Sequence, residues 1–224
     1  MRDGGVTVKS STMSSSPRRR PQGSGYWSDA SVFLWSWLRS PGATGAVLPS
    51  SQYLASAMAQ VVTRYETPTV AELGPGTGAL TTGIQRVLPP GGRHLAVELN
   101  PGFAQRLVAR FPEVEVVNDS AAALGRVLKE RGIERVDAVV SGLPFTAFPV
   151  ALQRDVLDAV VASVDPDNGV FTTFNYVGAY SMPAAQRFRV LLRRRFAEVM
   201  ISRPVLRNIP PAYVLTARKV RGDT

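Results

Sequence analysis

The chain contains no cysteine and a single histidine, His94, among its 224 residues. The lack of cysteine excludes disulfides, zinc–thiolate sites and thiol nucleophiles, and one histidine cannot build a metal cluster, so no metal site is expected. No apolar run approaches the ~20 residues that cross a bilayer. Residues 1–25 are rich in Ser, Gly and Arg and lack an apolar core segment. This composition argues against a secretory signal and predicts a disordered tail.

Lysine is also scarce, with 3 Lys against 23 Arg. Such a bias fits a GC-rich genome, so arginine enrichment alone is weak evidence for phosphate binding. The net charge of +9 still favours anionic partners, either nucleic acid or an anionic membrane surface. With 45% hydrophobic residues, the chain is large enough to form one domain with a full core.

Short apolar runs alternate with helical patterns from residue 66 onward. This alternation predicts an α/β fold with a mostly parallel sheet of seven strands, helices on both faces and a terminal antiparallel hairpin. We expect three regions: a tail over 1–25, a helical lid or membrane-contact segment over 26–65, and the catalytic domain over 66–224. The expected strands are 69–73, 93–98, 114–118, 136–141, 169–174, 196–205 and 212–219, and the expected helices are 28–39, 51–64, 79–87, 102–111, 121–131, 149–164 and 183–195.

A glycine-rich loop follows the first of these strands. Residues 71–78 read Ala-Glu-Leu-Gly-Pro-Gly-Thr-Gly, and a second acid, Glu98, ends the next strand. Glycines let a ligand lie against the backbone, and a carboxylate at Glu98 can chelate the two hydroxyls of a ribose. Together they describe a pocket for an adenosine-bearing cofactor. Gly74, Gly76 and Ala79 also satisfy the dinucleotide pattern G-x-G-x-x-A, which is a weak signal when it stands alone.

The acid before the glycines decides between cofactors. The phrase E-x-G-x-G-x-G resembles the cofactor loop of class I S-adenosylmethionine (SAM) methyltransferases, a family in which this acid helps to hold the amino-acid end of SAM. A pyrophosphate would gain nothing from a carboxylate there, so SAM is favoured over NAD. The alternative is that Glu72 only caps a tight turn, which leaves the second acid, Glu98, unexplained.

Four side chains fall at predicted strand ends, where parallel sheets bind ligands. They are Glu72, Glu98, Asp119 and Ser141. In the methyltransferases an acid at the place of Asp119 accepts from the adenine amino group; the alternative is a helix cap. The predicted cofactor-binding residues are Ser50, Ser51, Glu72, Gly74, Gly76, Gly78, Glu98, Leu99, Asp119, Ser120 and Ser141.

The acceptor side is expected after the fourth parallel strand, where residues 141–145 read Ser-Gly-Leu-Pro-Phe. Adenine N6-methylating enzymes carry Asn or Asp at the first place. Methyl transfer from a sulfonium is an in-line displacement that needs a neutral amine, which a hydroxyl or carbonyl can orient. Tyr176 follows the fifth strand, and an aromatic face attracts methylated ammonium groups; packing at the sheet edge is the alternative. We predict Ser141 and Tyr176 as the catalytic residues.

Four segments in this order resemble bacterial phospholipid N-methyltransferases, which convert phosphatidylethanolamine to phosphatidylcholine. The resemblance implies a phospholipid substrate, a peripheral location on the inner face of the cell membrane, and closure of residues 49–51 over the cofactor. It also implies that the helix at 28–39 contacts an anionic membrane surface through Phe33, Trp35 and Trp37; from its residues alone this helix could equally be a lid. The segments are 45–55, 72–78, 141–144 and 208–212.

Two other functions stay open at this point. A ribosomal RNA adenine dimethylase would share the fold and the basic charge. However, Ser141 replaces its Asn, and the chain leaves no room after the hairpin for the small RNA-binding domain, so nucleic acid is not the expected partner. The other alternative is a small-molecule SAM methyltransferase or a non-enzymatic protein with the SAM-binding fold. The sequence does not indicate the number of methyl groups added or the oligomeric state.

Overall fold

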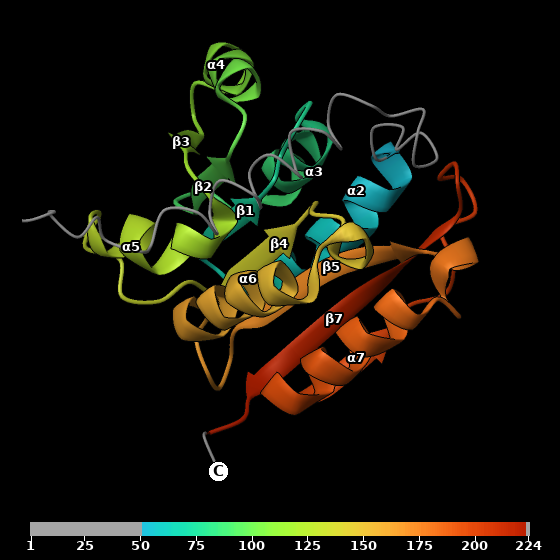
Figure 1. The fold of residues 1–224 in the computed structure, drawn as a ribbon. Helices are drawn as coiled ribbons and strands as arrows, with labels where there is room; N and C mark the ends of the chain where they lie inside the picture. The colour runs from blue at the N-terminus through green and yellow to red at the C-terminus, as the bar shows by residue number, and fades with distance from the viewer. Residues whose placement is uncertain (1–50, 223–224) are drawn as a thin grey trace, which may run out of the picture.

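The computed structural model describes residues 51–222 (Figure 1), so the expected tail and the tryptophan-containing helix lie outside the described residues. The strands form one seven-stranded sheet in the order β3-β2-β1-β4-β5-β7-β6. The first five strands are parallel, and β7 runs antiparallel to both β5 and β6. The predicted sheet with its terminal hairpin is therefore confirmed. The strands are β1 Thr69–Leu73, β2 Arg93–Glu98, β3 Glu115–Asn118, β4 Ala138–Ser141, β5 Val170–Tyr176, β6 Phe196–Ile201 and β7 Ala212–Val220.

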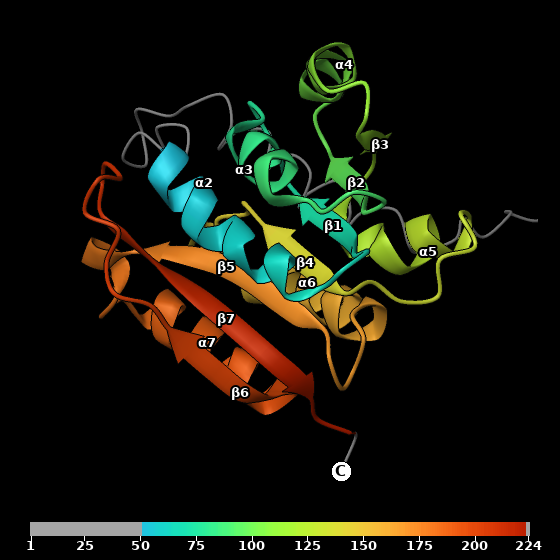
Figure 2. The ribbon, with the colours of Figure 1, turned by 180° about the vertical axis from the view of Figure 1, so that it is seen from behind.

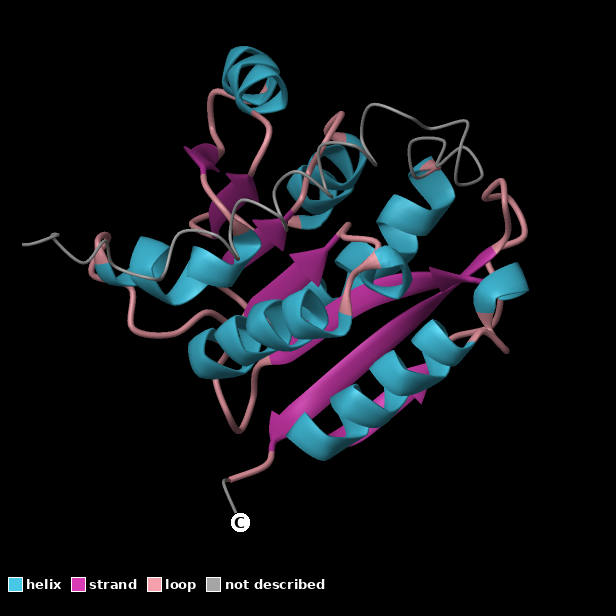
Figure 3. Ribbon diagram, in the orientation of Figure 1, coloured by secondary structure: helices cyan, strands magenta, loops and turns pink. Residues whose placement is uncertain are grey.

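Helices cover both faces of this sheet (Figure 3). Helices α5, α6 and α7 lie on the face seen in Figure 1, and α2 and α3 lie on the face seen in Figure 2. No helix within residues 51–222 is both long enough and apolar enough to cross a bilayer. The helices are α2 Gln52–Ala59, α3 Ala79–Val87, α4 Pro101–Arg110, α5 Leu124–Lys129, α6 Val150–Ser163 and α7 Pro183–Arg195, and the 3-10 helices are η1 Gln60–Arg64, η2 Ala121–Ala123, η3 Phe145–Ala147 and η4 Val177–Ala179.

The alternation of side chains along each strand divides the core into two main layers. Phe145 is the centre of the layer under α6 and α7, because its ring stacks on Phe188 at 4.4 Å and meets Phe171 edge-on at 6.1 Å. The layer under α2 and α3 includes Leu54 and Met58 of α2. Residues of α2 therefore share a hydrophobic core with the sheet. The regional division at residue 66 stays a prediction.

Several element ends differ from the predicted ones, and hydrogen bonding explains them. The helix expected over 51–64 changes after Ala59 to 3-10 geometry, and the one expected over 121–131 begins with a 3-10 turn. Strand β4 starts at Ala138 because Val136 forms only an isolated bridge. Strand β5 continues to Tyr176 because the antiparallel β7 pairs with it along its whole length.

Asn208, in the connection between β6 and β7, joins two distant parts of the chain. Its buried side chain accepts a hydrogen bond from the backbone N–H of Ser51 at 2.9 Å and donates one to the carbonyl oxygen of Pro210 at 2.7 Å. Ser51 is the N-cap of α2, and its own Oγ accepts from the N–H of Leu54 at 3.2 Å. The start of α2 is thus fixed by a residue 157 positions away.

Replacing Asn208 tests how much this connection stabilises the fold. We expect Asn208→Ala to lower the free energy of unfolding by about 2 kcal/mol, because it removes a buried amide that accepts from the N–H of Ser51 and donates to the carbonyl oxygen of Pro210. Urea denaturation measures the change. Asn168→Ala is the matched control, since Asn168 is exposed, and it should stay within about 0.5 kcal/mol of the wild type. Equal stabilities of the two variants would contradict the structural role.

Candidate active site

The parallel registers bring the predicted strand-end residues to one edge of the sheet. Leu73 aligns with Val97 on one side and with Ser141 on the other. Glu98 aligns with Asn118 on the neighbouring strand. The carboxyl ends of β1 to β4 therefore bring together the strand-end residues that the sequence predicted, which are Glu72, Glu98, Asp119 and Ser141. This edge is where open α/β sheets bind ligands.

The glycine loop after β1 needs glycine for two different reasons. At Gly74 the backbone has φ +67°, and a Cβ there would lie 2.4 Å from Cδ2 of Leu143. At Gly76 φ is +55°, but a Cβ would meet nothing within 4 Å. Gly74 thus permits close packing against the loop after β4, whereas the loop at Gly76 has an open side. The third glycine, Gly78, also has a positive φ and precedes α3.

Glu98 connects the end of β2 to this loop. One carboxylate oxygen accepts from the N–H of Gly76 at 3.0 Å, and the other accepts from the N–H of Asn100 at 2.8 Å. The side chain is buried, and burial raises the pKa of Glu98; the nearby charge of Glu72 adds to the rise, while the two backbone N–H groups oppose it. A carboxylate has about four acceptor sites, so both oxygens can accept further hydrogen bonds.

Glu72 lies beneath the loop, fully buried. Its Oε2 accepts from the hydroxyl of Thr81 at 2.8 Å, and Nε2 of His94 lies 3.1 Å from the same oxygen. Nδ1 of His94 is 2.8 Å from the side-chain nitrogen of Gln85, which can only donate, so a neutral imidazole carries its proton on Nε2, the nitrogen near Glu72. Oε1 of Glu72 has no hydrogen-bond partner in residues 51–222. An unpaired buried oxygen is costly, which fits a donor supplied by a ligand or water.

Sequence reasoning missed Thr81 and Gln85, and it considered His94 as a metal ligand, which it excluded. A signal for His94 exists in the strand alignment. It stands two residues before Ala96, the partner of Glu72 in the parallel register, so both side chains lie on the same face of the sheet. Thr81 gives a weaker signal. It lies in the first turn of α3, and its direction toward β1 is known only when the position of α3 on the sheet is known.

The ends of β2 and β3 are held together by Asn118, another residue that sequence reasoning missed. Its amide donates to the carbonyl oxygens of Glu98 and Leu99 at 2.8 and 3.0 Å. Asp119 accepts from the N–H of Ser120 at 2.7 Å and forms an ion pair with Arg126 of α5. The hydroxyl of Ser120, not the carboxylate of Asp119, caps the short helix η2.

The two predicted catalytic residues do not lie together in the sheet. Ser141 is fully buried on the α6 side, where its Oγ accepts from the N–H of Leu143 at 3.3 Å. Tyr176 packs on the α2 side, 5.4 Å from the ring of Phe174, and burial raises the pKa of its hydroxyl. The pairing of β4 with β5 places Tyr176 three residues, or about 10 Å, beyond the level of Ser141. Ser50 lies outside the described residues, and Ser51 caps α2.

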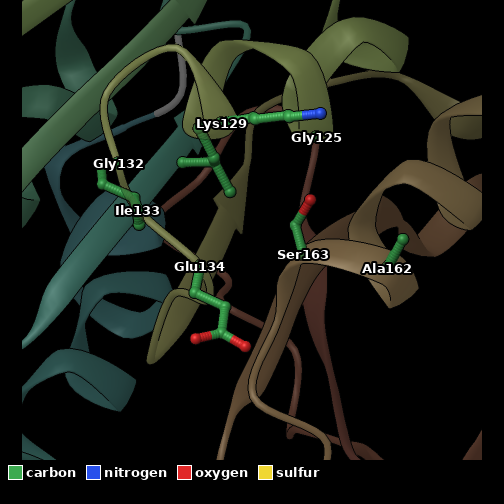
Figure 4. Close-up of a pocket in the computed structure, with 8 residues that line it drawn as sticks. Gly125, Lys129, Gly132, Ile133, Glu134, Ala162 and Ser163 are labelled. Atoms are coloured by element: carbon green, nitrogen blue, oxygen red, sulfur yellow. The ribbon is translucent and has the colours of Figure 1, made fainter.

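The glycine loop borders a cavity at the carboxyl edge of the sheet. A cavity of about 230 Å³ separates Gly76 and Thr77 from Phe103 and Arg106 of α4. A second one, of about 350 Å³, lies between the ends of α5 and α6 (Figure 4). There the hydroxyl of Ser163 points toward Gly125 and Lys129, at the amino ends of the strands. This second cavity contains none of the predicted site residues.

The contact between the two loops gives the first prediction for this site. A Cβ on Gly142 would lie 2.8 Å from the carbonyl oxygen of Gly74, which is backbone and cannot move aside cheaply. We expect Gly142→Ala to lower the free energy of unfolding by about 2 kcal/mol through overpacking. The matched control is Gly178→Ala, because a Cβ at Gly178 meets nothing within 4 Å. Urea denaturation compares the two, and equal effects would contradict the close packing.

The burial of Glu98 gives a pH prediction. In the folded state its pKa is raised above the ordinary 4.5 of the unfolded state. At a pH between the unfolded-state pKa and the folded-state pKa, the folded state therefore binds more protons than the unfolded state. Its contribution to the free energy of unfolding must therefore fall as the pH rises through this interval and stay constant above it. We expect the stability difference between wild type and Glu98→Gln to show this fall in urea titrations at stepped pH. A difference that rises with pH would contradict the assignment.

Comparison with known proteins shows the family of the chain. No protein-family model matches it. The ornithine lipid N-methyltransferase of Singulisphaera acidiphila is 35% identical over 198 residues, which are 86% of this chain and 97% of that protein. The O-methyltransferase TomG of Streptomyces achromogenes, solved in complex with SAM, has a TM-score of 0.60 at 18% identity, covering 88% of this chain and 95% of that one.

Two further solved structures share the fold. The precorrin-6y C5,15-methyltransferase of Geobacter metallireducens has a TM-score of 0.58 at 20% identity and covers 79% of this chain and 93% of that one. Fibrillarin of Aeropyrum pernix, with natively bound SAM, has a TM-score of 0.56 at 14% identity, covering 74% and 76%. The carboxyl-edge site lies on the same class I fold as these enzymes. The chain belongs to the family of SAM-dependent methyltransferases that includes the ornithine lipid N-methyltransferase of Singulisphaera acidiphila.

Proposed function

We propose that this enzyme transfers methyl groups from SAM to the amine of a lipid head group, at the anionic inner face of the cell membrane. The observation that carries the proposal is the 35% identity to a lipid N-methyltransferase along 97% of that protein's length. The geometry of the carboxyl edge supports it on the cofactor side. The distribution of charge supports it on the acceptor side.

The residues at the carboxyl edge fit SAM. The open side of the loop at Gly76 lets a ligand approach the backbone, and the carboxylate of Glu98 keeps acceptor sites for two ribose hydroxyls. The unpaired oxygen of Glu72 suits an ammonium group, directly or through water. When bound, SAM supplies an electrophilic methyl group on a sulfonium. The full proposed set is Ser50, Ser51, Glu72, Gly74, Gly76, Gly78, Glu98, Leu99, Asp119, Ser120 and Ser141.

On the acceptor side, Ser141 orients the amine. Its Oγ accepts one hydrogen bond from the N–H of Leu143, which leaves a lone pair to accept an N–H of the substrate. An amine held in this way can turn its own lone pair toward the methyl group. No protein base is required, provided that the amine arrives neutral. In this proposal Tyr176 attracts the methylated product through its aromatic face.

Charge is distributed unevenly between the two halves of the described fold. Residues 51–167, which include the glycine loop, Glu98 and Ser141, hold ten basic and thirteen acidic residues. Residues 168–222, which include α7, β6 and β7, hold ten basic residues and one acid, Glu198. One of these bases is Arg189, which is buried, donates to the carbonyl of Tyr180 at 2.9 Å, and has no ionic partner in the described chain. A buried base next to Tyr180, close to the end of β5, suits a head group that carries an anion near its amine.

Two amino lipids meet this description. Phosphatidylethanolamine, suggested by the sequence motifs, carries a phosphate two carbons from a primary amine. Ornithine lipid is the substrate named for the Singulisphaera relative. Its head group is an amino acid, with a carboxylate as the anion. The proposed class is therefore an amine with a nearby anion on a lipid.

Methyl transfer from labelled SAM tests the proposal. Vesicles of phosphatidylglycerol mixed with either phosphatidylethanolamine or ornithine lipid are incubated with the enzyme, beside a tube of ribosomal RNA. We expect label in at least one lipid and none in RNA. Glu98→Gln should weaken SAM binding roughly 30-fold, because the ribose hydroxyls lose their charged acceptor.

The control variant is Glu134→Gln, which alters an exposed acid at the opposite edge of the sheet and should leave both quantities unchanged. Label in RNA alone would assign the enzyme to nucleic-acid methylation. SAM binding without label in any lipid would reject the lipid acceptor while leaving the cofactor site intact.

A further inference from the structure

The connection between β6 and β7, residues 202–211, carries the two most exposed large apolar side chains of the described chain. Leu206 is 74% exposed and Ile209 is 72% exposed. In Figure 1 this connection is the red loop that extends beyond the sheet next to the start of α2 and to η4. Single exposed apolar residues are common on proteins, whereas two on one protruding loop need a reason.

Several hydrogen bonds hold this loop in one conformation. Asn208 binds it to Ser51, as described above, and the N–H of Val177 donates to the carbonyl oxygen of Pro211 at 2.8 Å. The guanidinium of Arg207 lies 5.0 Å from the centre of the Tyr53 ring on α2. The backbone is therefore fixed to both of its neighbours. Leu206 and Ile209 are therefore exposed on a loop of fixed conformation, and poor packing of the loop does not explain their exposure.

A second apolar segment lies beside the loop. Val177, Tyr180 and Met182, in the connection from β5 to α7, are 40%, 48% and 55% exposed, and the hydrogen bond of Val177 to Pro211 joins the two connections. We call the exposed side chains of both connections the apolar rim. Its members are Leu206, Ile209, Val177, Tyr180 and Met182.

The charges along the loop at 202–211 are of one sign. Arg203 and Arg207 are exposed and alternate along the loop with the apolar side chains, and no acidic residue occurs between Glu198 and Asp223. Apolar side chains among unopposed arginines complement the surface of an anionic bilayer, in which phosphates lie directly above acyl chains. A protein partner of this surface would need an equally uncompensated acidic patch.

The rim also lies at the correct end of the fold. The carboxyl end of β5 and the amino end of β7 meet there, since Tyr176 pairs with Ala212. This is the same edge of the sheet as Ser141 and the glycine loop. Contact of the rim with a membrane would therefore bring the acceptor side of the site to the lipid head groups.

We infer that the apolar rim inserts into the head-group region of an anionic bilayer, with Arg203 and Arg207 at the phosphates. The inference rests on the proposed lipid substrate, and it names a contact separate from that predicted for Phe33, Trp35 and Trp37. The loop is then a membrane anchor built into the catalytic domain. The Asn-x-Pro-Pro-Ala segment at 208–212 serves to hold that anchor in place.

Vesicle flotation of the full chain tests the inference without any turnover. Wild type and variants are mixed with vesicles of phosphatidylcholine that contain about one third phosphatidylglycerol, an anionic lipid that attracts basic side chains, and with pure phosphatidylcholine. Leu206→Ser and Ile209→Ser should each lower the partition coefficient roughly fivefold. Arg203→Gln with Arg207→Gln should lower it by more than tenfold on anionic vesicles only, from about fivefold for each arginine.

Matched controls lie on other faces of the molecule. Val108→Ser removes an equally apolar side chain that is 55% exposed on α4, and Arg86→Gln with Arg193→Gln removes two exposed arginines at the ends of α3 and α7. These controls should bind vesicles as the wild type does. Thermal unfolding of every variant separates loss of binding from loss of fold.

Each other outcome is decisive. Rim variants that bind like the wild type would overturn the inference, and so would a wild type that does not bind anionic vesicles. If residues 1–50 cover the rim instead, the rim variants should be proteolysed faster while their vesicle binding is unchanged. If a second copy of the chain covers it, the rim variants should sediment with a lower mass, again with unchanged vesicle binding. Vesicle binding through the rim without methylation of any lipid would reject the proposed function and leave the anchor standing.

Discussion

The backbone contact between the loops after β1 and β4 is the constraint on which the site depends. Gly142 donates its N–H to the carbonyl of Leu73 at 2.9 Å, and Gly74 donates to the carbonyl of Val97 at 3.0 Å, so the glycine loop is tied to the strands on both sides. No side chain fits between Gly142 and Gly74. Because the loop cannot shift, Gly76 stays within reach of Glu98, and the acceptor loop starts at a fixed distance from the cofactor side.

Two buried carboxylates lie behind this loop, and they are stabilised in different ways. Glu98 is held by backbone N–H groups, while Glu72 is held by Thr81 with His94 beside it. Burial raises the pKa of Glu98, and the nearby charge of Glu72 raises it further, so the pair is electrostatically unfavourable when nothing positive is near. SAM carries a sulfonium and an ammonium. In the proposed function, a bound cation relieves the repulsion that the fold alone leaves in place, and this gives the site affinity for a cationic cofactor.

The sequence was sufficient for the fold because each strand and helix has a local signal. The turn of glycines, the acids at strand ends and the βαβ alternation all depend on residues close together in the chain. The environment of these acids could not be predicted in the same way. Asn208 reaches Ser51 across 157 positions, and Arg126 reaches Asp119 only because η2 turns the chain back toward β3. The same limit applies to Ser141 and Tyr176, whose separation follows from the extension of β5 by its antiparallel partner.

Asn208 couples the start of α2, next to the proposed cofactor site, to the β6–β7 connection that is proposed to contact the membrane. Its side chain holds the β6–β7 connection and, through the N–H of Ser51, the first turn of α2. Ser51 is the last residue of the segment predicted to close over the cofactor, whereas the connection carries Leu206 and Ile209 outward. A force on the exposed loop is therefore transmitted to the start of α2 through this buried amide and through the contact of Arg207 with the ring of Tyr53. Under the proposed function, a lipid surface that holds the loop also holds the cofactor side in register with its substrate.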